Sequence, residues 1–190
     1  MIEKAIEKLE KDELIVYPTE TVYGLGGDAF STEAVKKVFK TKDRPRNEPI
    51  SIAISDWSMI KKVADIDRVE ENIMRNTLPG PITYIVKRKQ VESLKILAAG
   101  KDKIGIRFPS HPVALGLISR FGKPITSTSA NKTGEPAPKF FSEIKLDLNW
   151  KIFGGKPFYD KPSTVFDLTQ DELIRRGPIP ISSIKKATWN

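Results

Sequence analysis

The sequence predicts an α/β protein in which helices flank a central sheet. Two observations support this fold class: about seven short strand patterns are interspersed with helix patterns, and the connections between them are short. No internal repeat or low-complexity linker divides the chain. Because 190 residues is a typical length for one domain, we expect a single domain over residues 1–190.

The N-terminal part has the pattern helix, strand, glycine-rich loop and helix. Apolar residues at helical spacing predict a helix over 2–11, and the apolar run 14–17 predicts a strand that Pro18 ends. A glycine-rich stretch follows at 24–27, and Ser31 is placed to cap the next helix. Strand, glycine-rich loop and helix together can bind an anion, although a plain turn also explains this loop.

Three further strand patterns follow. Isoleucines alternate with small residues over 50–54, apolar residues run over 82–86, and apolar residues alternate again over 104–108. Asp56 and Asp67 are expected to cap two helices between the first two of these strands. These helices are expected to bury Trp57, Ile60, Val63, Val69 and Ile73.

The remaining elements are a helix and three strands. Pro112 opens a helix that should stop at Gly122. Strands are expected at 165–168 and from 173 to Arg175.

The segment 124–134 lies between this helix and the first of these strands. It carries six hydroxyl or amide side chains and is too polar for a core strand. Read as extended chain, it places Ser127, Ser129 and Asn131 on one face. Such groups can bind phosphate oxygens, a ribose or an amino acid. A polar edge strand running into a turn would have the same composition.

The composition excludes several kinds of site. The chain has no cysteine, and His111 is its one histidine, so disulfides, thiol nucleophiles and histidine clusters are excluded. Any metal would have to be bound by oxygen atoms or through a substrate's phosphates. No apolar run is long enough to span a membrane, and the N-terminal segment lacks the apolar centre of a signal peptide, so we expect a cytoplasmic protein.

The net charge of +8 is partly local. Six cations fall within eleven residues: Lys36, Lys37, Lys40, Lys42, Arg44 and Arg46. Such a cluster attracts polyanions, but its first three members also fit the solvated face of a helix. Arg107 is the one charge on the 104–108 strand, so it either has a partner or lies on an exposed face.

Seven separated motifs, in this order, resemble those of the YrdC-like family, and within it the short, single-domain threonylcarbamoyl-AMP synthases. They cover nearly the whole chain: YPTETVYGLGGDA at 17–29, KDRPRNEP at 42–49, PGPIT at 79–83, IRFPSHP at 106–112, TSTSANKTGEP at 126–136, STVFDL at 163–168 and RRG at 175–177. Seven matches in register identify the chain as a member of this family.

The resemblance implies a twisted, open sheet of mixed parallel and antiparallel strands around a deep basic cavity. It also implies a reaction that joins L-threonine, bicarbonate and ATP into threonylcarbamoyl-adenylate and releases pyrophosphate, with Mg2+ bound through the phosphates. The implied partner is a transferase that modifies the adenosine beside the anticodon of tRNA, and binding of double-stranded RNA or tRNA is a further implied property. Longer relatives cover the cavity with a second domain, so here we expect an open cavity or one closed by the chain's own termini.

The resemblance also implies a set of site residues. Its catalytic group is Lys42, Arg44, Ser129 and Asn131. Lys42 and Arg44 are expected to be solvent-facing loop cations that neutralise the triphosphate. The implied ATP contacts are Lys42, Arg44, Asn131, Lys139 and Arg175, with Arg176 as the competing choice for the last. The implied threonine contacts are Thr21, Arg107, Ser129 and Ser163, and the threonine carboxylate would supply the missing partner of Arg107.

Four other positions carry weaker expectations. His111 is expected to pack or to cap a helix. Glu20 either helps to place the metal or accepts backbone N–H groups in its own turn. Many members of the family have Asn at the position of Glu48 and His at that of Ala53, so the contacts implied there are absent or altered in this chain.

Two other functions fit parts of the sequence. One is a carbamoyl-adenylate-forming enzyme of the same fold, as in hydrogenase maturation proteins, whose additional cysteine-based zinc sites this chain lacks. The other is an RNA-binding module without catalysis, for which the net charge would suffice. Against the second, only 8% of the residues are aromatic, and most are expected to lie in apolar stripes rather than on stacking surfaces.

Overall fold

The structure is a computed structural model that describes residues 1–186. Its centre is a nine-stranded sheet in the order β1-β2-β7-β3-β6-β5-β8-β9, with β4 paired to β5. The pairs β3–β6 and β5–β8 are parallel and the other pairs are antiparallel. The predicted fold class, a mixed open sheet with flanking helices, is therefore confirmed.

The strands are β1 (Ile15–Tyr17), β2 (Gly24–Gly26), β3 (Ser51–Ala53), β4 (Ala64–Asp65), β5 (Ile82–Arg88), β6 (Lys103–Arg107), β7 (Ile125–Ser129), β8 (Thr164–Asp167) and β9 (Glu172–Arg175). The α-helices are α1 (Ile2–Glu10), α2 (Thr32–Thr41), α3 (Ile60–Val63), α4 (Arg68–Thr77), α5 (Glu92–Leu97), α6 (Pro112–Phe121) and α7 (Ile181–Lys186). Two short 3-10 helices are η1 (Trp57–Met59) and η2 (Phe141–Glu143).

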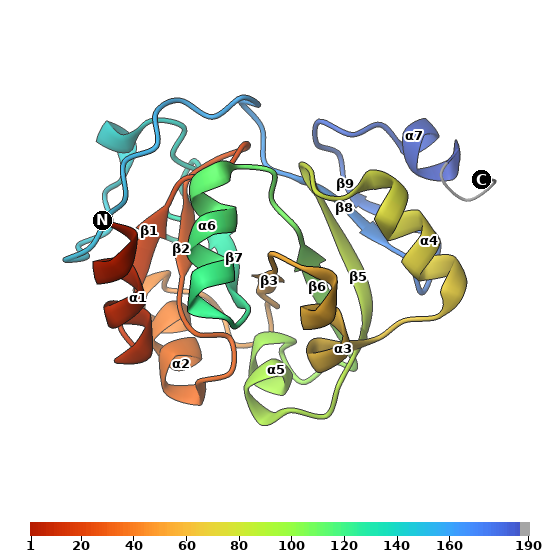
Figure 1. Ribbon diagram of the computed structural model, residues 1–190, viewed down its shortest axis with the longest axis horizontal. Helices are drawn as coiled ribbons and strands as arrows, with labels where there is room; N and C mark the ends of the chain where they lie inside the picture. Colours follow the sequence, from red (N-terminus) through yellow and green to blue (C-terminus); the bar gives the residue numbers. More distant parts are fainter. Residues whose placement is uncertain (187–190) are drawn as a thin grey trace.

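The helices cover the two halves of the sheet unequally. Figure 1 shows α1, α2 and α6 grouped over β1, β2 and β7, with α4 beside β5 at the other end. A long irregular segment, residues 130–163, connects β7 to β8 and crosses the top of that view. No helix among residues 1–186 is both long and apolar enough to cross a membrane.

The predicted helix ends are confirmed by their capping contacts. The Ser31 hydroxyl accepts the amide of Ala34, and Asp67 forms a reciprocal capping box with Glu70. Gly122 ends α6 in the left-handed conformation, at φ 74°, which glycine adopts without a side-chain clash. These local signals lie close together in the sequence, so they could be read from it directly.

The glycine-rich stretch after β1 was predicted incorrectly. It is not a loop or a plain turn: Gly24–Gly26 forms β2, which pairs with β1 on one side and β7 on the other. The buried ring of Tyr17 explains the composition, because a Cβ atom on Gly24 would lie 2.9 Å from that ring. The glycines therefore make room for a neighbouring aromatic side chain.

The burial of Val69 was also predicted incorrectly, since its exposed fraction is 58%. The buried positions of α4 are Ile73 and Met74, both in its second half, so the first turn of the helix extends beyond the core. On α2 the expected solvated face is confirmed, because Lys36 and Lys40 are exposed and Val35 and Val38 are buried.

Candidate active site

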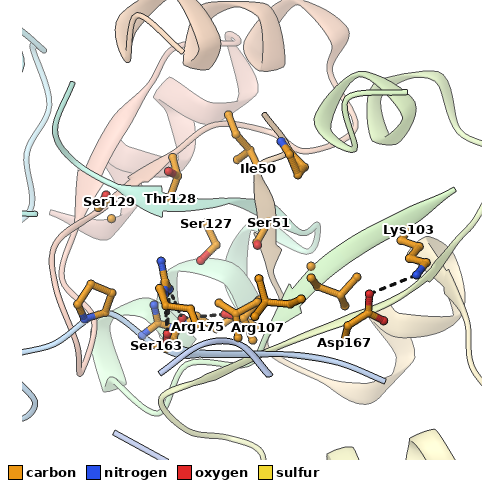
Figure 2. Close-up of a pocket in the computed structure, with 18 of the residues that line it drawn as sticks. Ile50, Ser51, Lys103, Arg107, Ser127, Thr128, Ser129, Ser163, Asp167 and Arg175 are labelled. Carbon is orange, nitrogen blue, oxygen red and sulfur yellow. Dashed lines mark hydrogen bonds and ion pairs between the residues drawn. The ribbon is translucent and has the colours of Figure 1, made fainter. Parts of the chain in front are cut away.

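A cavity of about 760 Å³ opens on the sheet where β3, β5, β6, β7 and β8 meet. Figure 2 shows Ser51 and Ser127 at its centre, with side chains from the other strands around them. Ser51 and Ser127 are paired across β3 and β7. On the next strand Gly105 lies so close that an added Cβ would overlap the Ser51 hydroxyl. Small side chains on three neighbouring strands therefore leave the space open.

The charged side chains that line this cavity are mostly basic. They are Arg44, Lys101, Lys103, Arg107 and Arg175, against the carboxylates Asp102 and Asp167. Because the walls remove much of the water around a bound anion, cations here act more strongly than they would at an open surface.

Arg107, at the end of β6, has protein partners that the sequence did not reveal. Its terminal nitrogen Nη2 donates to Glu20 Oε1 at 2.7 Å, to Thr21 Oγ1 at 2.6 Å and to Thr19 Oγ1 at 3.2 Å. The exposed-face reading of Arg107 is wrong, since the side chain is buried. The other reading, that Arg107 has a partner, is confirmed, and this partner is Glu20, which forms an ion pair with it.

One donor of Arg107 nevertheless stays unused. Its Nε is buried and has no hydrogen-bond partner among residues 1–186. A buried donor without a partner costs stability, and a bound ligand can supply the missing acceptor. Arg107 therefore lines the cavity with its orientation fixed by Glu20, and its side-chain hydrogen bonds among residues 1–186 all come from Nη2.

Glu20 joins two loops at this corner. Besides Arg107, its carboxylate accepts the backbone amide of Ser110 at 3.2 Å, and its carbonyl accepts the amide of Tyr159 at 2.7 Å. The expected backbone N–H contact exists, but it comes from the loop after β6 rather than from Glu20's own turn. Among residues 1–186 no group of three or more histidine, aspartate or glutamate side chains could hold a metal ion.

Ser163 and Arg175 form the neighbouring wall. The Ser163 hydroxyl is 2.9 Å from the Thr83 hydroxyl, and the Arg175 guanidinium donates to the Ser163 carbonyl at 2.8 and 3.0 Å. Burial, followed by the nearby charge of Arg107, lowers the pKa of Arg175. Both Arg175 and Arg176 are exposed, but of the two only Arg175 lines the cavity.

Gly177, which closes the RRG motif, lies against the chain that carries Ser163. An added Cβ would overlap the backbone nitrogen of Thr164 and lie 2.6 Å from the carbonyl carbon of Ser163. Gly177→Ala is therefore expected to destabilise the protein by about 1–3 kcal/mol and to displace Ser163. The matched control is Gly116→Ala, inside α6, where the nearest atom is Ile2 Cδ1 at 3.7 Å.

The control should stabilise the protein by about 0.5–1 kcal/mol, because alanine is the better helix former. Urea unfolding of both variants measures the two free energies of unfolding. Equal stability of the two variants would contradict the close packing at Gly177.

Lys42 was predicted as a solvent-facing loop cation, and this is wrong. It caps α2, its residue is only 1% exposed, and its Nζ donates to the carbonyl oxygens of Ser129 and Asn131, both at 2.6 Å. Burial, followed by the positive charge of Arg44, lowers the pKa of Lys42 to about 8. Lys42 directly follows α2, and its side chain extends to the end of β7 and lies outside the cavity lining.

Arg44, two residues on, does line the cavity. Its Nε donates to the carbonyl of Glu48 at 3.2 Å and its Nη2 to that of Pro49 at 2.9 Å, while the Glu48 carboxylate lies 3.5 Å away. Burial is the main cause that lowers the pKa of Arg44, and Glu48 partly opposes the shift. Arg44 is thus a partly exposed, oriented cation at the cavity wall.

The other predicted site residues lie at different depths. Ser129 lines the cavity, whereas Thr21 lies behind Arg107 and is fully buried. The Asn131 amide donates to the carbonyls of Lys132 and Glu135, and its Oδ1 is buried without a partner in the described chain. Lys139 is exposed and outside the cavity lining.

His111 caps α6, as expected. Its Nδ1 accepts the backbone amide of Val113 at 3.2 Å, which requires that nitrogen to be unprotonated. Burial is the main cause that lowers the pKa of His111, and this favours the neutral ring at pH 7.

Two cavity residues escaped the sequence prediction. Lys103 on β6 and Asp167 on β8 form an ion pair of 3.2 Å at the end of the cavity away from Ser129, as Figure 2 shows. A charged residue within the otherwise apolar run 165–168 was the available signal, because a buried carboxylate usually has a partner.

Most of the described aromatic side chains are buried or half-buried, as expected, but the segment 140–158 is an exception. The exposed side chains there are Phe140, Phe141, Phe153 and Phe158, with exposed fractions from 36% to 84%. The absence of stacking surfaces is therefore no longer an argument against nucleic-acid binding.

Comparison with known proteins supports the assignment of the fold. The family model Sua5_yciO_yrdC, described as "Telomere recombination", matches residues 7–177. A threonylcarbamoyl-AMP synthase from Pyrococcus abyssi is 34% identical over 185 residues, covering 94% of this chain and 54% of the relative. One from Histophilus somni is 34% identical over 186 residues, covering 93% of this chain and 99% of the relative.

The crystal structure of P. abyssi Sua5 complexed with L-threonine superposes with a TM-score of 0.93 at 32% identity. This superposition covers 98% of this chain and 56% of that one. The chain thus spans about half the length of the P. abyssi relative and nearly all of the H. somni relative.

Proposed function

This chain belongs to the Sua5–YciO–YrdC family, and from that premise we propose that it is an L-threonylcarbamoyladenylate synthase. The substrates are L-threonine, bicarbonate and ATP, and the products are threonylcarbamoyl-adenylate and pyrophosphate. The observation that carries the proposal is the cavity whose lining includes Arg44, Ser129, Arg107, Ser163 and Arg175. Its volume of about 760 Å³ is in the range that encloses small organic ligands.

We place L-threonine beside Arg107 and Ser163. The Arg107 guanidinium would bind the threonine carboxylate, with the Ser163 hydroxyl as a second contact. The L-threonine complex of the P. abyssi relative supports this assignment. Thr21 contributes from behind by fixing the Arg107 guanidinium, and Ser129 lies where a threonine contact from β7 is expected.

We place the triphosphate of ATP between Arg44 and Ser129. Arg44 would neutralise phosphate charge, and the Ser129 hydroxyl would donate to a phosphate oxygen. Arg175, Asn131 and Lys139 are further ATP contacts in this proposal, and Lys139 would have to move from its exposed position to take part. Mg2+ would be held mainly by the phosphates, which fits the lack of a carboxylate cluster among residues 1–186.

The chemistry requires position and charge rather than a side-chain nucleophile. The free amine of threonine adds to CO2 and loses a proton to solvent, or reacts with bicarbonate and releases water, to give a carbamate. A carbamate oxygen then attacks the α-phosphorus, the bond to the β-phosphate breaks, and pyrophosphate leaves with that electron pair. Arranging these groups in line within a cationic, water-poor cavity lowers the barrier, because the developing charge meets fixed donors.

The product is an activated acyl-adenylate, so a second enzyme must accept its threonylcarbamoyl group. We propose that this is the transferase that modifies adenosine beside the tRNA anticodon, and that the synthase is a cytoplasmic protein with one domain over 1–190. The net charge of +8 and the exposed phenylalanines at 140–158 favour RNA binding as a second property.

Pyrophosphate release from ATP and bicarbonate tests the proposal, with threonine present, absent, or replaced by serine, glycine or carbamoyl phosphate. Release that requires both threonine and bicarbonate is the expected result. Release with carbamoyl phosphate alone would indicate the carbamoyl-adenylate-forming reaction instead. No release under any condition, together with salt-sensitive RNA binding, would indicate a binding module.

A further inference from the structure

Lys42 joins the end of α2 to the turn that follows β7 through three hydrogen bonds. Its Nζ donates to the carbonyls of Ser129 and Asn131, both at 2.6 Å, and its own carbonyl accepts the amide of Thr133 at 2.7 Å. Both Nζ bonds carry a charged donor, and such bonds are roughly twice as strong as neutral ones. Both the ammonium group and the backbone carbonyl of Lys42 therefore bind one five-residue segment, 129–133.

Other hydrogen bonds also hold that segment: the Ala130 amide donates to the Tyr23 carbonyl at 2.9 Å, and the Asn131 side-chain amide donates to the carbonyls of Lys132 and Glu135. The Asn131 Oδ1 and the Thr133 Oγ1 are both buried and have no hydrogen-bond partner among residues 1–186. Buried polar atoms without partners destabilise a turn, so the bonds that remain carry more of its conformation. The ammonium group of Lys42 supplies two of them.

Two of the three N–H groups of the Lys42 ammonium are already donated to these carbonyls, so a phosphate could be reached only through the third. The side chain is buried, lies outside the cavity lining and already has two carbonyl partners. Ser129, whose carbonyl it holds, is in the cavity lining. The side chain that can touch a ligand is thus Ser129, and the side chain that fixes its backbone is Lys42.

We infer that Lys42 is a positioning residue: its ammonium group holds the 129–133 turn so that Ser129 faces the cavity, and it does not bind the phosphates itself. The identity of the ligand at Ser129 rests on the proposed function. The hydrogen bonds between Lys42 and the 129–133 turn are present in the ligand-free protein, so they can be tested without any substrate.

Hydrogen exchange on the ligand-free protein is the first test, with Lys42→Met as the variant. Methionine has a similar length and keeps the buried space filled, but it cannot donate to the two carbonyls. We expect the amides of Ala130, Asn131 and Thr133 to exchange at least about tenfold faster than in the wild type. Arg44→Met is the matched control, because Arg44 has no contact with the turn among those described, and exchange there should be unchanged. Unchanged exchange in Lys42→Met would overturn the inference.

Two further experiments separate positioning from direct phosphate binding: a crystal structure of an ATP-analogue complex and steady-state kinetics. The crystal structure uses the wild-type protein, so it remains informative if Lys42→Met folds poorly. In wild-type crystals with a non-hydrolysable ATP analogue, Nζ should stay within hydrogen-bond distance of both carbonyls. A phosphate oxygen bound to Nζ would overturn the inference. In steady-state assays Lys42→Met should lower kcat by at least about tenfold with little change in the KM for ATP, whereas Arg44→Met should both lower kcat and raise that KM. A Lys42→Met variant that raises the KM for ATP would also overturn the inference, while a wild-type protein that releases no pyrophosphate would refute the proposed function and leave the exchange result valid.

Discussion

Arg44→Ala is expected to lower threonine-dependent pyrophosphate release by about 10²–10³-fold, the usual loss when one preorganised donor to developing charge is removed. Arg44 lines the cavity, and two backbone carbonyls hold its guanidinium in place before any ligand binds. Burial lowers its pKa, but arginine remains charged at neutral pH. Initial rates at saturating threonine and bicarbonate, with ATP varied, measure the effect.

Arg46→Ala is the matched control, two residues further along the same basic segment. Arg46 is exposed, stacks over the Phe39 ring at 5.2 Å and does not line the cavity. Its removal should leave the rate within about twofold of the wild type, as is usual for an exposed side chain away from a site. If Arg44→Ala retained the same rate as Arg46→Ala, Arg44 would have no place in the catalytic site.

Arg107→Met is expected to cause two losses, one in threonine binding and one in stability. The substitution removes the donor proposed for the threonine carboxylate and leaves Glu20 as a buried carboxylate without its cation. Breaking a buried ion pair by removing one partner costs about 3–5 kcal/mol. Urea unfolding measures the loss of stability, and calorimetric titration with threonine measures the loss of binding.

The double variant Glu20→Gln with Arg107→Met separates these two losses. The neutral glutamine removes the uncompensated charge, so most of the lost stability should return. Threonine binding should not return, because the guanidinium is still missing. A double variant that binds threonine would contradict the role proposed for Arg107, and an Arg107→Met variant as stable as the wild type would contradict the buried ion pair.

The elements of this fold were predictable where their signals are local. The caps at Ser31 and Asp67, the stop at Gly122 and the alternation over 50–54 each depend on residues within a few positions of one another, and all are found in the structure. The strand at 24–26 was missed because its glycines reflect the ring of Tyr17 on the neighbouring strand. That reason becomes visible only once the two strands are paired.

The site was predictable as a set of residues but not as a set of contacts. Arg107 and Glu20 are 87 residues apart, and nothing in either neighbourhood indicates that they form an ion pair. Lys42 looked like a loop cation because its neighbours are polar, yet the turn after β7 buries it. Residue types indicate which chemistry is available, whereas long-range packing decides which groups touch a ligand and which hold those groups in place.

The most direct test of the proposed reaction is mass spectrometry of the product formed from ATP, L-threonine and carbon-13 bicarbonate. The account predicts an adduct of AMP with threonylcarbamate that carries the heavy carbon, formed together with pyrophosphate. It also predicts that the adduct is lost in Arg44→Ala and retained in Arg46→Ala. Pyrophosphate formed with free AMP or an unlabelled adduct, or no turnover at all, would contradict the proposal that this cavity joins threonine and bicarbonate to ATP.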